Sequence, residues 1–328
     1  MMEFLSKNKS QKMNLIVTGG AGFIGSNLSE KLLTEGHNVI CIDNFNEYYD
    51  PSIKRRNIEL LKSDRFKLYE GDILDKNFLE EVFFENKIEI VIHLAAMAGV
   101  RPSIDNPFNC YNVNVIGTLN VLEVMKKFNV NKMVFASSSS LYGNNEKLPF
   151  SEGDNVDNPI SPYAASKKSG ELLCYTYSHL YKFNINCLRF FTVYGPKQRP
   201  DLAIYKFTKA LLNHEPIHFY GNGSTRRDYT HVNDIVHGII NALEKLDGYN
   251  VYNLGESSTI SLLDLIRLLE KYTEEKAEII YLPMQAGDVM QTYADISKAK
   301  VNLAYLPKVS IENGLNDFVK WYKNNHSI

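Results

Sequence analysis

The feature that most constrains this chain is a glycine-rich turn between two predicted strands near its N-terminus. An apolar, partly β-branched run at residues 15–17 leads into the turn at 18–25, and an amphipathic helical pattern follows. A second buried strand is predicted at 38–42. Parallel neighbouring strands need such a helical crossover, so the pattern predicts a β-α-β unit. A glycine-rich turn at this place in the unit is typical of dinucleotide binding.

The glycines of this turn, Gly19, Gly22 and Gly25, each have a physical role at the start of a helix. One permits the tight turn, one lets backbone N–H groups approach a pyrophosphate, and one lets the helix pack closely on the strand. The helix N-terminus adds partial positive charge for the same anion. The alternative is a purely structural turn.

Carboxylates follow the next two predicted strands. Asp43 stands 18 residues after Gly25, where it can accept a hydrogen bond from a ribose hydroxyl and repel a 2′-phosphate. We therefore expect NAD rather than NADP. Asp72 and Ile73 follow the third strand as candidate contacts to the adenine, and an ordinary turn aspartate is the alternative for Asp72.

Apolar strands and amphipathic helices continue to alternate along the first 190 residues. The pattern predicts strands at 66–69, 88–94, 133–137 and 185–190, with helices at 75–86, 111–128 and 162–182. Such alternation predicts an α/β fold, a Rossmann-type doubly wound parallel sheet with helices on both faces.

The character of the chain changes after residue 190. Gly, Pro and Tyr become frequent, and short strands mix with helices near 202–212, 262–272 and 312–324. We expect an NAD-binding Rossmann domain at 13–190 with a return of about 229–256, and a smaller mixed α/β substrate domain at 191–328. Residues 1–12 are expected to form a disordered leader.

A tyrosine and a lysine open the predicted helix at 162–182. Ser161 suits the N-cap and Pro162 the first helical position, so Tyr163 and Lys167 fall on one face about one turn apart. An ammonium near a phenol lowers the pKa of the phenol, which lets the tyrosine act as an acid/base near neutral pH. By itself the pair has a plain alternative, a solvated contact on a helix surface.

The serine run at 137–140 follows the strand predicted at 133–137. Ligands bind at the carboxyl ends of strands in open parallel sheets, so Ser138 is placed to complete a Ser–Tyr–Lys set. In that set the phenolate takes the proton of a substrate alcohol while the serine orients the oxygen. The alternative for the run is a polar loop.

Composition excludes several classes of protein. The 328 residues are 44% hydrophobic with a net charge of −2 and no basic block, so nucleic acid and polybasic membrane binding are not predicted. The most apolar stretch, 88–100, is too short to span a bilayer, and residues 1–12 lack the apolar core of a signal peptide. The four cysteines form no C-x-x-C pattern, so we expect no metal site and a cytoplasmic location.

Taken together, the motifs resemble the nucleotide-sugar 4-epimerases of the extended short-chain dehydrogenase/reductase family over nearly the whole chain after residue 12. They are TGGAGFIGSN at 18–27, HLAA at 93–96, N-x-x-G-T at 114–118, SSSSLYG at 137–143, YAASK at 163–167, LRFFTVYGP at 188–196 and RRDYTHVNDI at 226–235. The resemblance implies an NAD site lined by Phe23, Ile24, Asp43, Asn44, Asn46, Asp72, Ile73, Leu94, Ala95, Ala96, Asn114, Tyr163, Lys167 and Phe191.

The resemblance also implies a UDP-sugar substrate. Ser138 and Ser140 would hold the sugar hydroxyl that is oxidised, and the nucleotide diphosphate-sugar would lie against Arg101, Thr192, Arg227 and the segment near Asp288. An arginine suits a diphosphate because its fork matches phosphate oxygens. Without the resemblance, residues 226–228 would be interpreted as a surface salt-bridge cluster.

Residues after the strand at 133–137 favour epimerisation over two related reactions. Dehydratases of the family resemble one another in an Asp-Glu pair at the places of Ser139 and Ser140, and decarboxylases that make UDP-xylose carry Glu at the place of Ser140. Epimerisation needs only removal and return of a hydride at C4. We therefore expect an epimerase that holds NAD tightly.

The segment G-P-x-x-R-P-D-x-A at 195–203 resembles that of UDP-glucuronate 4-epimerases, and its Arg199 suits a carboxylate. Gln285 stands where many glucose and N-acetylglucosamine epimerases have arginine. Thr292 stands where UDP-glucose-restricted enzymes have tyrosine. The main prediction is therefore interconversion of UDP-glucuronate and UDP-galacturonate.

Other features leave alternatives to this sugar. Lys197-Gln198 replaces the more usual Trp-Gly, and Pro102 replaces the expected aromatic residue. The alternatives are a UDP-N-acetylhexosamine or a lactyl-substituted sugar, whose carboxylate would also suit Arg199. The separate alternative for Arg199 itself is a loop arginine capped by Asp201. A non-catalytic NAD-binding regulator is the alternative from another class. The helices at 111–128 and 162–182 match the pair that forms a four-helix bundle between subunits of such enzymes, so a homodimer is expected.

Overall fold

A computed structural model describes residues 12–283 and 289–326 of the chain, so the predicted leader at 1–12 falls almost entirely outside the described residues. The fold class is confirmed. The main sheet has seven parallel strands in the order β11-β6-β5-β4-β1-β2-β3. Its strands are β1 Asn14–Thr18, β2 Asn38–Asp43, β3 Phe66–Glu70, β4 Ile90–His93, β5 Lys132–Ser138, β6 Asn184–Phe190 and β11 Tyr249–Leu254.

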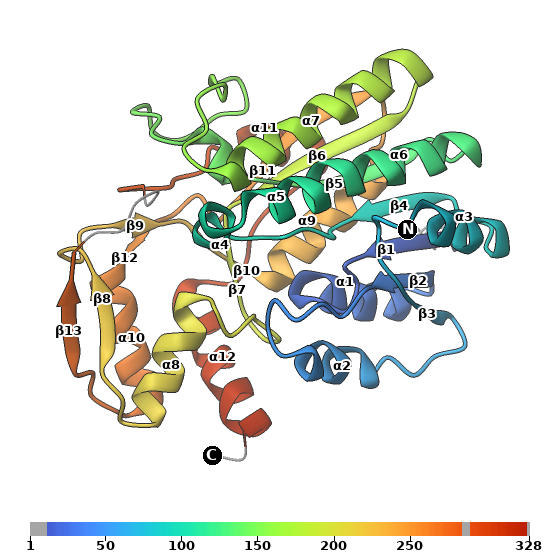
Figure 1. Ribbon diagram of the computed structural model, residues 1–328. Helices are drawn as coiled ribbons and strands as arrows, with labels where there is room; N and C mark the ends of the chain where they lie inside the picture. Colours follow the sequence, from blue (N-terminus) through green and yellow to red (C-terminus); the bar gives the residue numbers. More distant parts are fainter. Residues whose placement is uncertain (1–11, 284–288, 327–328) are drawn as a thin grey trace, which may run out of the picture.

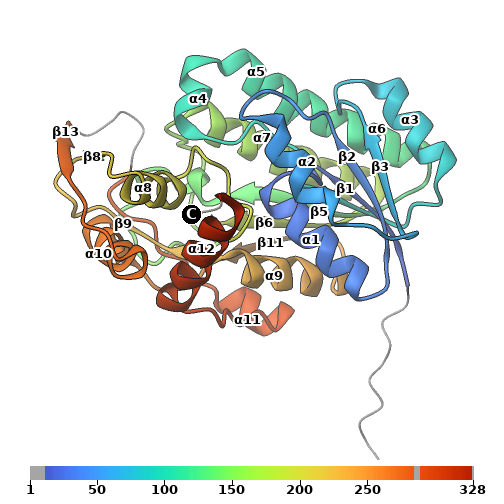
Figure 2. The same cartoon turned by 90° about the horizontal axis from the view of Figure 1, so that it is seen from below.

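Helices cover both faces of this sheet (Figure 2). One face carries α1 Phe23–Thr34, α9 Val232–Glu244 and α11 Ser297–Leu303, and the other carries α3 Lys76–Glu85, α6 Thr118–Lys127 and α7 Pro162–Tyr181. Successive residues of β1 alternate between the two cores: Leu15 and Val17 pack with the α1 face, and Ile16 packs with the α3 face. Burial on both faces explains why these strands are apolar throughout.

The remaining elements surround the sheet or form the C-terminal part of the chain. Around the sheet lie α2 Pro51–Glu59, α4 Val100–Asp105, α5 Pro107–Tyr111, the π-helical turn η1 Asn112–Gly117 and the 3-10 turn η2 Ser139–Tyr142. In the C-terminal part are β7 Thr192–Tyr194, α8 Ala203–Leu212, β8 Ile217–Tyr220, β9 Arg226–Arg227, β10 Tyr229–His231, β12 Ile260–Ser261, α10 Leu262–Thr273, β13 Ile279–Leu282 and α12 Ile311–His326.

A separate apolar core lies among the C-terminal helices. Ile204, Leu265 and Phe318, from α8, α10 and α12, are fully buried in it, together with Phe219 of β8. Figure 1 shows these elements beside the carboxyl edge of the main sheet. Strand β11 and helix α9 instead return to the sheet, where β11 pairs with β6.

Most predicted elements are present with boundaries shifted by a few residues. The helix predicted at 111–128 is composite, because η1 with its π-helical backbone precedes α6. Helix α2 and the short strands β7, β9, β10, β12 and β13 were not predicted from the sequence. Since the sheet is parallel, Thr18, Asp43, His93 and Ser138 all end their strands at one edge. Ligands bind at that edge in open sheets of this kind.

Candidate active site

A cavity of about 460 Å³ runs along the carboxyl edge of the sheet and reaches the C-terminal elements. It also contacts residues that the sequence did not indicate, among them Tyr48, Tyr49, Lys54, Met97 and Ala98. From the predicted site it gathers Gly19, Gly22, Phe23, Ile24, Gly25, Asp43, Asn44, Asn46, Asp72, Ile73, Leu94, Ala95, Ala96, Ser138, Ser140, Tyr163, Lys167, Phe191, Thr192 and Arg199.

The glycine turn forms one end of the cavity with backbone alone. Gly19 has a φ of +67°, and a Cβ there would lie 2.9 Å from the backbone of Ala95. A Cβ on Gly25 would collide with the carbonyl oxygen of Gly19. Helix α1 begins at Phe23, and its N-cap Gly22 offers no side chain to the first N–H groups. This cradle of bare N–H groups fits the pyrophosphate of a dinucleotide.

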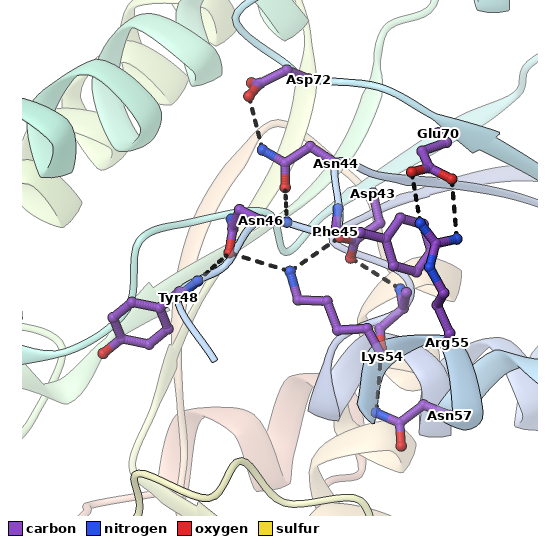
Figure 3. A network of polar contacts seen from close by, with 11 residues as sticks. Asp43, Asn44, Phe45, Asn46, Tyr48, Lys54, Arg55, Asn57, Glu70 and Asp72 are labelled. Atoms are coloured by element: carbon purple, nitrogen blue, oxygen red, sulfur yellow. Dashed lines mark hydrogen bonds and ion pairs between the residues drawn. The ribbon is translucent and has the colours of Figure 1, made fainter. Parts of the chain in front are cut away.

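Asp43 stands beside the turn and carries a buried counter-ion (Figure 3). Its Oδ2 accepts a hydrogen bond from Ala21 N (3.2 Å), and its Oδ1 accepts bonds from Phe45 N (2.9 Å) and Lys54 Nζ (3.2 Å). Both side chains of the ion pair are nearly inaccessible, with exposures of 8% for Lys54 and 4% for Asp43. The sequence gave no signal for Lys54, because α2 was not predicted and no motif includes it.

The aspartate after the third strand makes a turn interaction and also lines the cavity. Asp72 Oδ1 accepts a bond from Leu74 N (2.9 Å), which is the turn interaction. Its Oδ2 accepts a bond from Asn44 Nδ2 (2.8 Å), and both residues line the cavity (Figure 3).

Helix α7 presents the predicted acid/base group. Its start is confirmed: Ser161 is the N-cap, with Oγ accepting a bond from Ala164 N (3.1 Å), and Pro162 is the first residue. Tyr163 and Lys167 both reach the cavity, as does Ser138 from the end of β5. Lys167 Nζ donates a hydrogen bond to Ala136 O (2.8 Å).

Electrostatics around the tyrosine differ from the expectation. Burial raises the pKa of Tyr163, while a hydrogen bond with Ser138 and the positive charge of Arg199 lower it. The sequence predicted that role for the ammonium of Lys167. It is held on the Ala136 carbonyl, and burial lowers its own pKa to about 8.

A buried ion pair supports the strand that carries Ser138. Arg189 of β6 donates to both carboxylate oxygens of Glu171 on α7, through Nε (2.9 Å) and Nη2 (2.8 Å). Ser137 Oγ donates to the same carboxylate (2.6 Å). Arg189 Nη1 also donates to Tyr142 OH (3.0 Å). The serine beside Ser138 is thus tied to the helix of Tyr163, one turn beyond Lys167.

Arg199 enters the cavity as part of an ion pair. Its Nε and Nη2 donate to the two carboxylate oxygens of Asp201, both at 2.9 Å, and Nη2 also donates to Ala98 O (3.3 Å). The guanidinium lies over the ring of Tyr48, 5.4 Å from its centroid. The capping by Asp201 that was weighed as an alternative is therefore present, and the arginine lines the cavity nonetheless.

Three predicted contacts lie elsewhere in the described structure. Asn114 is 2% exposed behind the cavity wall, where its amide bonds to Met97 rather than facing the cavity. Arg101 lies on the surface of α4 over the ring of Tyr220 (5.0 Å). Arg227 donates to Arg226 O (3.0 Å) and does not line the cavity. These placements arise from tertiary contacts that no local motif encodes.

One further specificity position, Thr292, lies away from the cavity, and two others, Asp288 and Gln285, lie outside the described residues. Thr292 is buried and accepts a bond from Asp228 N through Oγ1 (3.2 Å). Asp228 itself is fully buried and accepts bonds from Glu256 N, Ser257 N, Ala294 N and Thr230 Oγ1, so residues 226–228 do not form a surface salt-bridge cluster.

Two features are absent from the described part of the chain. Within residues 12–283 and 289–326, no helix has the length and apolar character needed to cross a membrane. The same residues contain no group of three or more His, Cys, Asp or Glu side chains arranged to hold a metal ion.

Comparison with known proteins finds relatives along nearly the whole chain. Residues 16–318 match the family described as GDP-mannose 4,6 dehydratase. The UDP-glucuronate 4-epimerase of Thermodesulfobacterium geofontis is 47% identical over 312 residues, which cover 94% of this chain and 96% of that protein.

Solved structures resemble the whole molecule. The UDP-glucuronic acid 4-epimerase of Bacillus cereus, in complex with UDP-glucuronic acid and NAD, has a TM-score of 0.90 and 37% identity, covering 95% of this chain and all of that one. The UDP-N-acetylglucosamine 4-epimerase of Methanobrevibacter ruminantium, in complex with UDP-N-acetylmuramic acid, has a TM-score of 0.88 and 30% identity, covering 96% and 99%.

Proposed function

Because the chain belongs to the nucleotide-sugar epimerases of the extended short-chain dehydrogenase/reductase family, we propose that it interconverts UDP-glucuronate and UDP-galacturonate. It is an NAD-dependent UDP-sugar 4-epimerase. The choice of sugar rests on the position of Arg199. Its guanidinium lines the cavity, and its positive charge lowers the pKa of Tyr163. A substituent on the sugar ring must lie near the acid/base when C4 does, and a carboxylate is the substituent that suits arginine.

The chain's own residues supply the acid/base work of the reaction. NAD, when bound, accepts the hydride of C4 and returns it to the opposite face of the ring. Tyr163 takes the proton of the C4 hydroxyl during oxidation and gives it back during reduction. Ser138, at the end of β5, orients the sugar oxygen toward the phenol. Lys167 supplies positive charge in the same cavity.

Residues of η2 support epimerisation rather than the dehydration for which the matching family is named. Elimination of water needs an acid and a base beside the sugar, and Ser139 and Ser140 stand at the two places where the dehydratases carry them. Neither hydroxyl titrates near neutral pH. Ser140 Oγ accepts a bond from Ser138 Oγ (3.0 Å), which supports its proposed contact with the sugar. Thr192 lines the cavity as a further hydroxyl.

The hydrogen bonds that Arg199 makes within the chain leave one of its guanidinium nitrogen atoms to bind a ligand. Asp201 takes Nε and Nη2, and Nη1 has no acceptor among residues 12–283 and 289–326. Asp201 also fixes the guanidinium plane, which lowers the entropy lost when a ligand carboxylate binds. In the same proposal residues 13–190 with 229–256 bind NAD, and residues 191–328 bind the UDP-sugar. Arg227 and the segment near Asp288 would hold the nucleotide diphosphate-sugar.

The test is a panel of UDP-sugars incubated with the enzyme, with products separated by chromatography. We expect turnover of UDP-glucuronate, and an Arg199→Met variant should lose at least about 100-fold in kcat/KM for it, as expected when a charged hydrogen bond to substrate is lost. An Arg199→Lys variant keeps the charge without the fork and serves as the matched control. Turnover of UDP-N-acetylglucosamine but not of uronates would instead support the hexosamine alternative.

We also propose a homodimer through α6 and α7. Large apolar side chains on and beside these helices are exposed: Phe108 (84%), Ile116 (47%), Leu172 (54%), Tyr175 (55%) and Leu180 (58%). Figure 1 shows α5, α6 and α7 side by side on one face of the sheet. An exposed apolar surface of this kind marks an interaction site.

A further inference from the structure

Helix α4 supplies a hydrogen-bond acceptor for the first turn of helix α7. The two residues that form the bond are 60 positions apart in the sequence. Ser103 of α4 is 3% exposed, and its Oγ accepts a hydrogen bond from the backbone N–H of Tyr163 (3.0 Å). Its own hydroxyl proton goes to Val100 O (2.5 Å), one turn earlier in α4. With that proton committed, the Oγ lone pairs are left to face Tyr163.

This bond satisfies a donor that α7 cannot satisfy itself. The first N–H groups of a helix have no intrahelical acceptor. Ser161 covers the N–H of Ala164, and Pro162 has none, which leaves the N–H of Tyr163 to an outside partner. An unpaired N–H in a site closed to water destabilises the fold, because its lost hydrogen bond to water is not replaced. The acceptor that avoids this cost is placed on another helix, so the cap also fixes where α7 begins relative to α4.

A second link joins the same two segments. Asn114 accepts a bond from Met97 N (2.8 Å) and donates to Met97 O (3.1 Å) and Ser166 Oγ (2.9 Å). Ser166 Oγ in turn donates to Tyr163 O (2.8 Å). Ser103 of α4 therefore contacts the N–H of Tyr163 directly, whereas Met97 is linked to the carbonyl of Tyr163 through Asn114 of η1 and Ser166 of α7.

We propose that Ser103 is a positioning residue, which holds the backbone of Tyr163 so that its phenol meets Ser138 and the sugar hydroxyl. The inference rests on the proposed role of Tyr163 as the acid/base. Tyr163 is only the second residue of α7, where helices fray, so an acceptor outside the helix steadies its backbone. A misplacement of about 1 Å at a reacting group can cost on the order of 100-fold in rate.

The experiment compares Ser103→Ala with Ser103→Thr, which keeps the hydroxyl, using whichever UDP-sugar the wild-type enzyme turns over. We expect Ser103→Ala to lower kcat by roughly 10- to 100-fold with KM changed less than about threefold, and Ser103→Thr to restore most of kcat. The pH profile is the readout that a structural cap would not move. If the phenol loses its hydrogen bond with Ser138, the pKa of Tyr163 rises and the profile of kcat shifts to higher pH.

Two further variants keep the inference falsifiable. Ser310→Ala removes a serine cap at the start of α12, where Oγ accepts a bond from Asn313 N (3.3 Å), and it should lose stability without any shift of the pH profile. Ser103→Cys has a side chain of similar size whose sulfur is a weaker hydrogen-bond acceptor. It therefore replaces Ser103→Ala in the test if Ser103→Ala does not fold.

The outcomes separate this inference from the proposed function. Wild-type kcat and an unshifted pH profile in folded Ser103→Ala or Ser103→Cys, alongside an inactive Tyr163→Phe, would overturn the role of Ser103 alone. Full activity in Tyr163→Phe would remove Tyr163 as the acid/base, and the role of Ser103 with it.

Discussion

The buried pair of Arg189 and Glu171 offers the sharpest test of how the site is held together. Each side chain is only 4% exposed, and Arg189 makes two bonds to the Glu171 carboxylate and one to Tyr142 OH. The perturbation is Arg189→Met, which keeps much of the volume and removes the charge. Among residues 12–283 and 289–326, Glu171 then keeps only the hydroxyl of Ser137 as a side-chain donor.

The size of the loss follows from desolvation. Removing one partner of a buried ion pair leaves an uncompensated charge and costs about 3–5 kcal/mol. Domains unfold with about 5–15 kcal/mol in total, so Arg189→Met should lose roughly a fifth or more of the stability. Replacing both charges with apolar side chains removes the uncompensated charge, so Arg189→Met/Glu171→Met should lose less than about 2 kcal/mol.

The assay is urea unfolding of the wild type, both single variants and the double variant at one fixed NAD concentration, since bound NAD adds to the stability of every sample. The double-mutant cycle then gives the coupling between the two residues, expected at about 2 kcal/mol or more. Additive losses, or an Arg189→Met protein within about 1 kcal/mol of the wild type, would refute the view that this pair is a strongly coupled buried support.

Other predictions address the acid/base, the pH dependence of stability and the subunit contact. Tyr163→Phe should lower kcat by about 10²–10⁴-fold with NAD still bound, as measured by product formation and by cofactor content. Burial, with Asp234 and Asp228 nearby, raises the pKa of Glu256 to about 7. The stability tied to this group is therefore full below the ordinary carboxyl pKa and is lost as pH rises through about 7. At pH 8 the free energy of unfolding of Glu256→Gln should exceed that of the wild type by on the order of 1 kcal/mol, after allowance for the partial exposure of this side chain. In urea titrations below pH 5 the two free energies should be equal. Leu172→Glu puts a charge into the proposed α6–α7 contact, and light scattering should show monomers where the wild type shows dimers.

Local patterns were enough to predict the parts of the site that lie within one strand-to-helix transition. The turn at Gly19, the carboxylate Asp43 and the capped start of α7 each depend on neighbours in sequence, and each lies where the pattern placed it. Strand ends meet at one edge in any parallel sheet, which brings Ser138 to the same cavity as the glycine turn.

Contacts between distant segments were not predictable in this way. Lys54 reaches Asp43 only because α2 folds over the turn, and Ser103 reaches Tyr163 from α4. The place of Asn114, predicted as a contact to NAD, depends on such a neighbour too: the π-helical turn η1 directs its amide to Met97. A sequence motif specifies which residue type stands at a position. It does not specify which distant residue the tertiary fold brings into contact with that position.

The charge that tunes Tyr163 is the clearest consequence of such a neighbour. Helical spacing suggested Lys167, whereas in the folded chain Arg199 is the cation that lowers the pKa of Tyr163. The residue proposed to bind the sugar carboxylate therefore also lowers the pKa of the proposed acid/base, Tyr163. Loss of its charge in Arg199→Met should raise the pKa of Tyr163 and move the pH profile of the residual turnover to higher pH, and Arg199→Lys should leave the profile near that of the wild type. If the profiles of Arg199→Met and the wild type superimpose, recognition of the sugar and tuning of the tyrosine are separate, and Arg199 serves only the first.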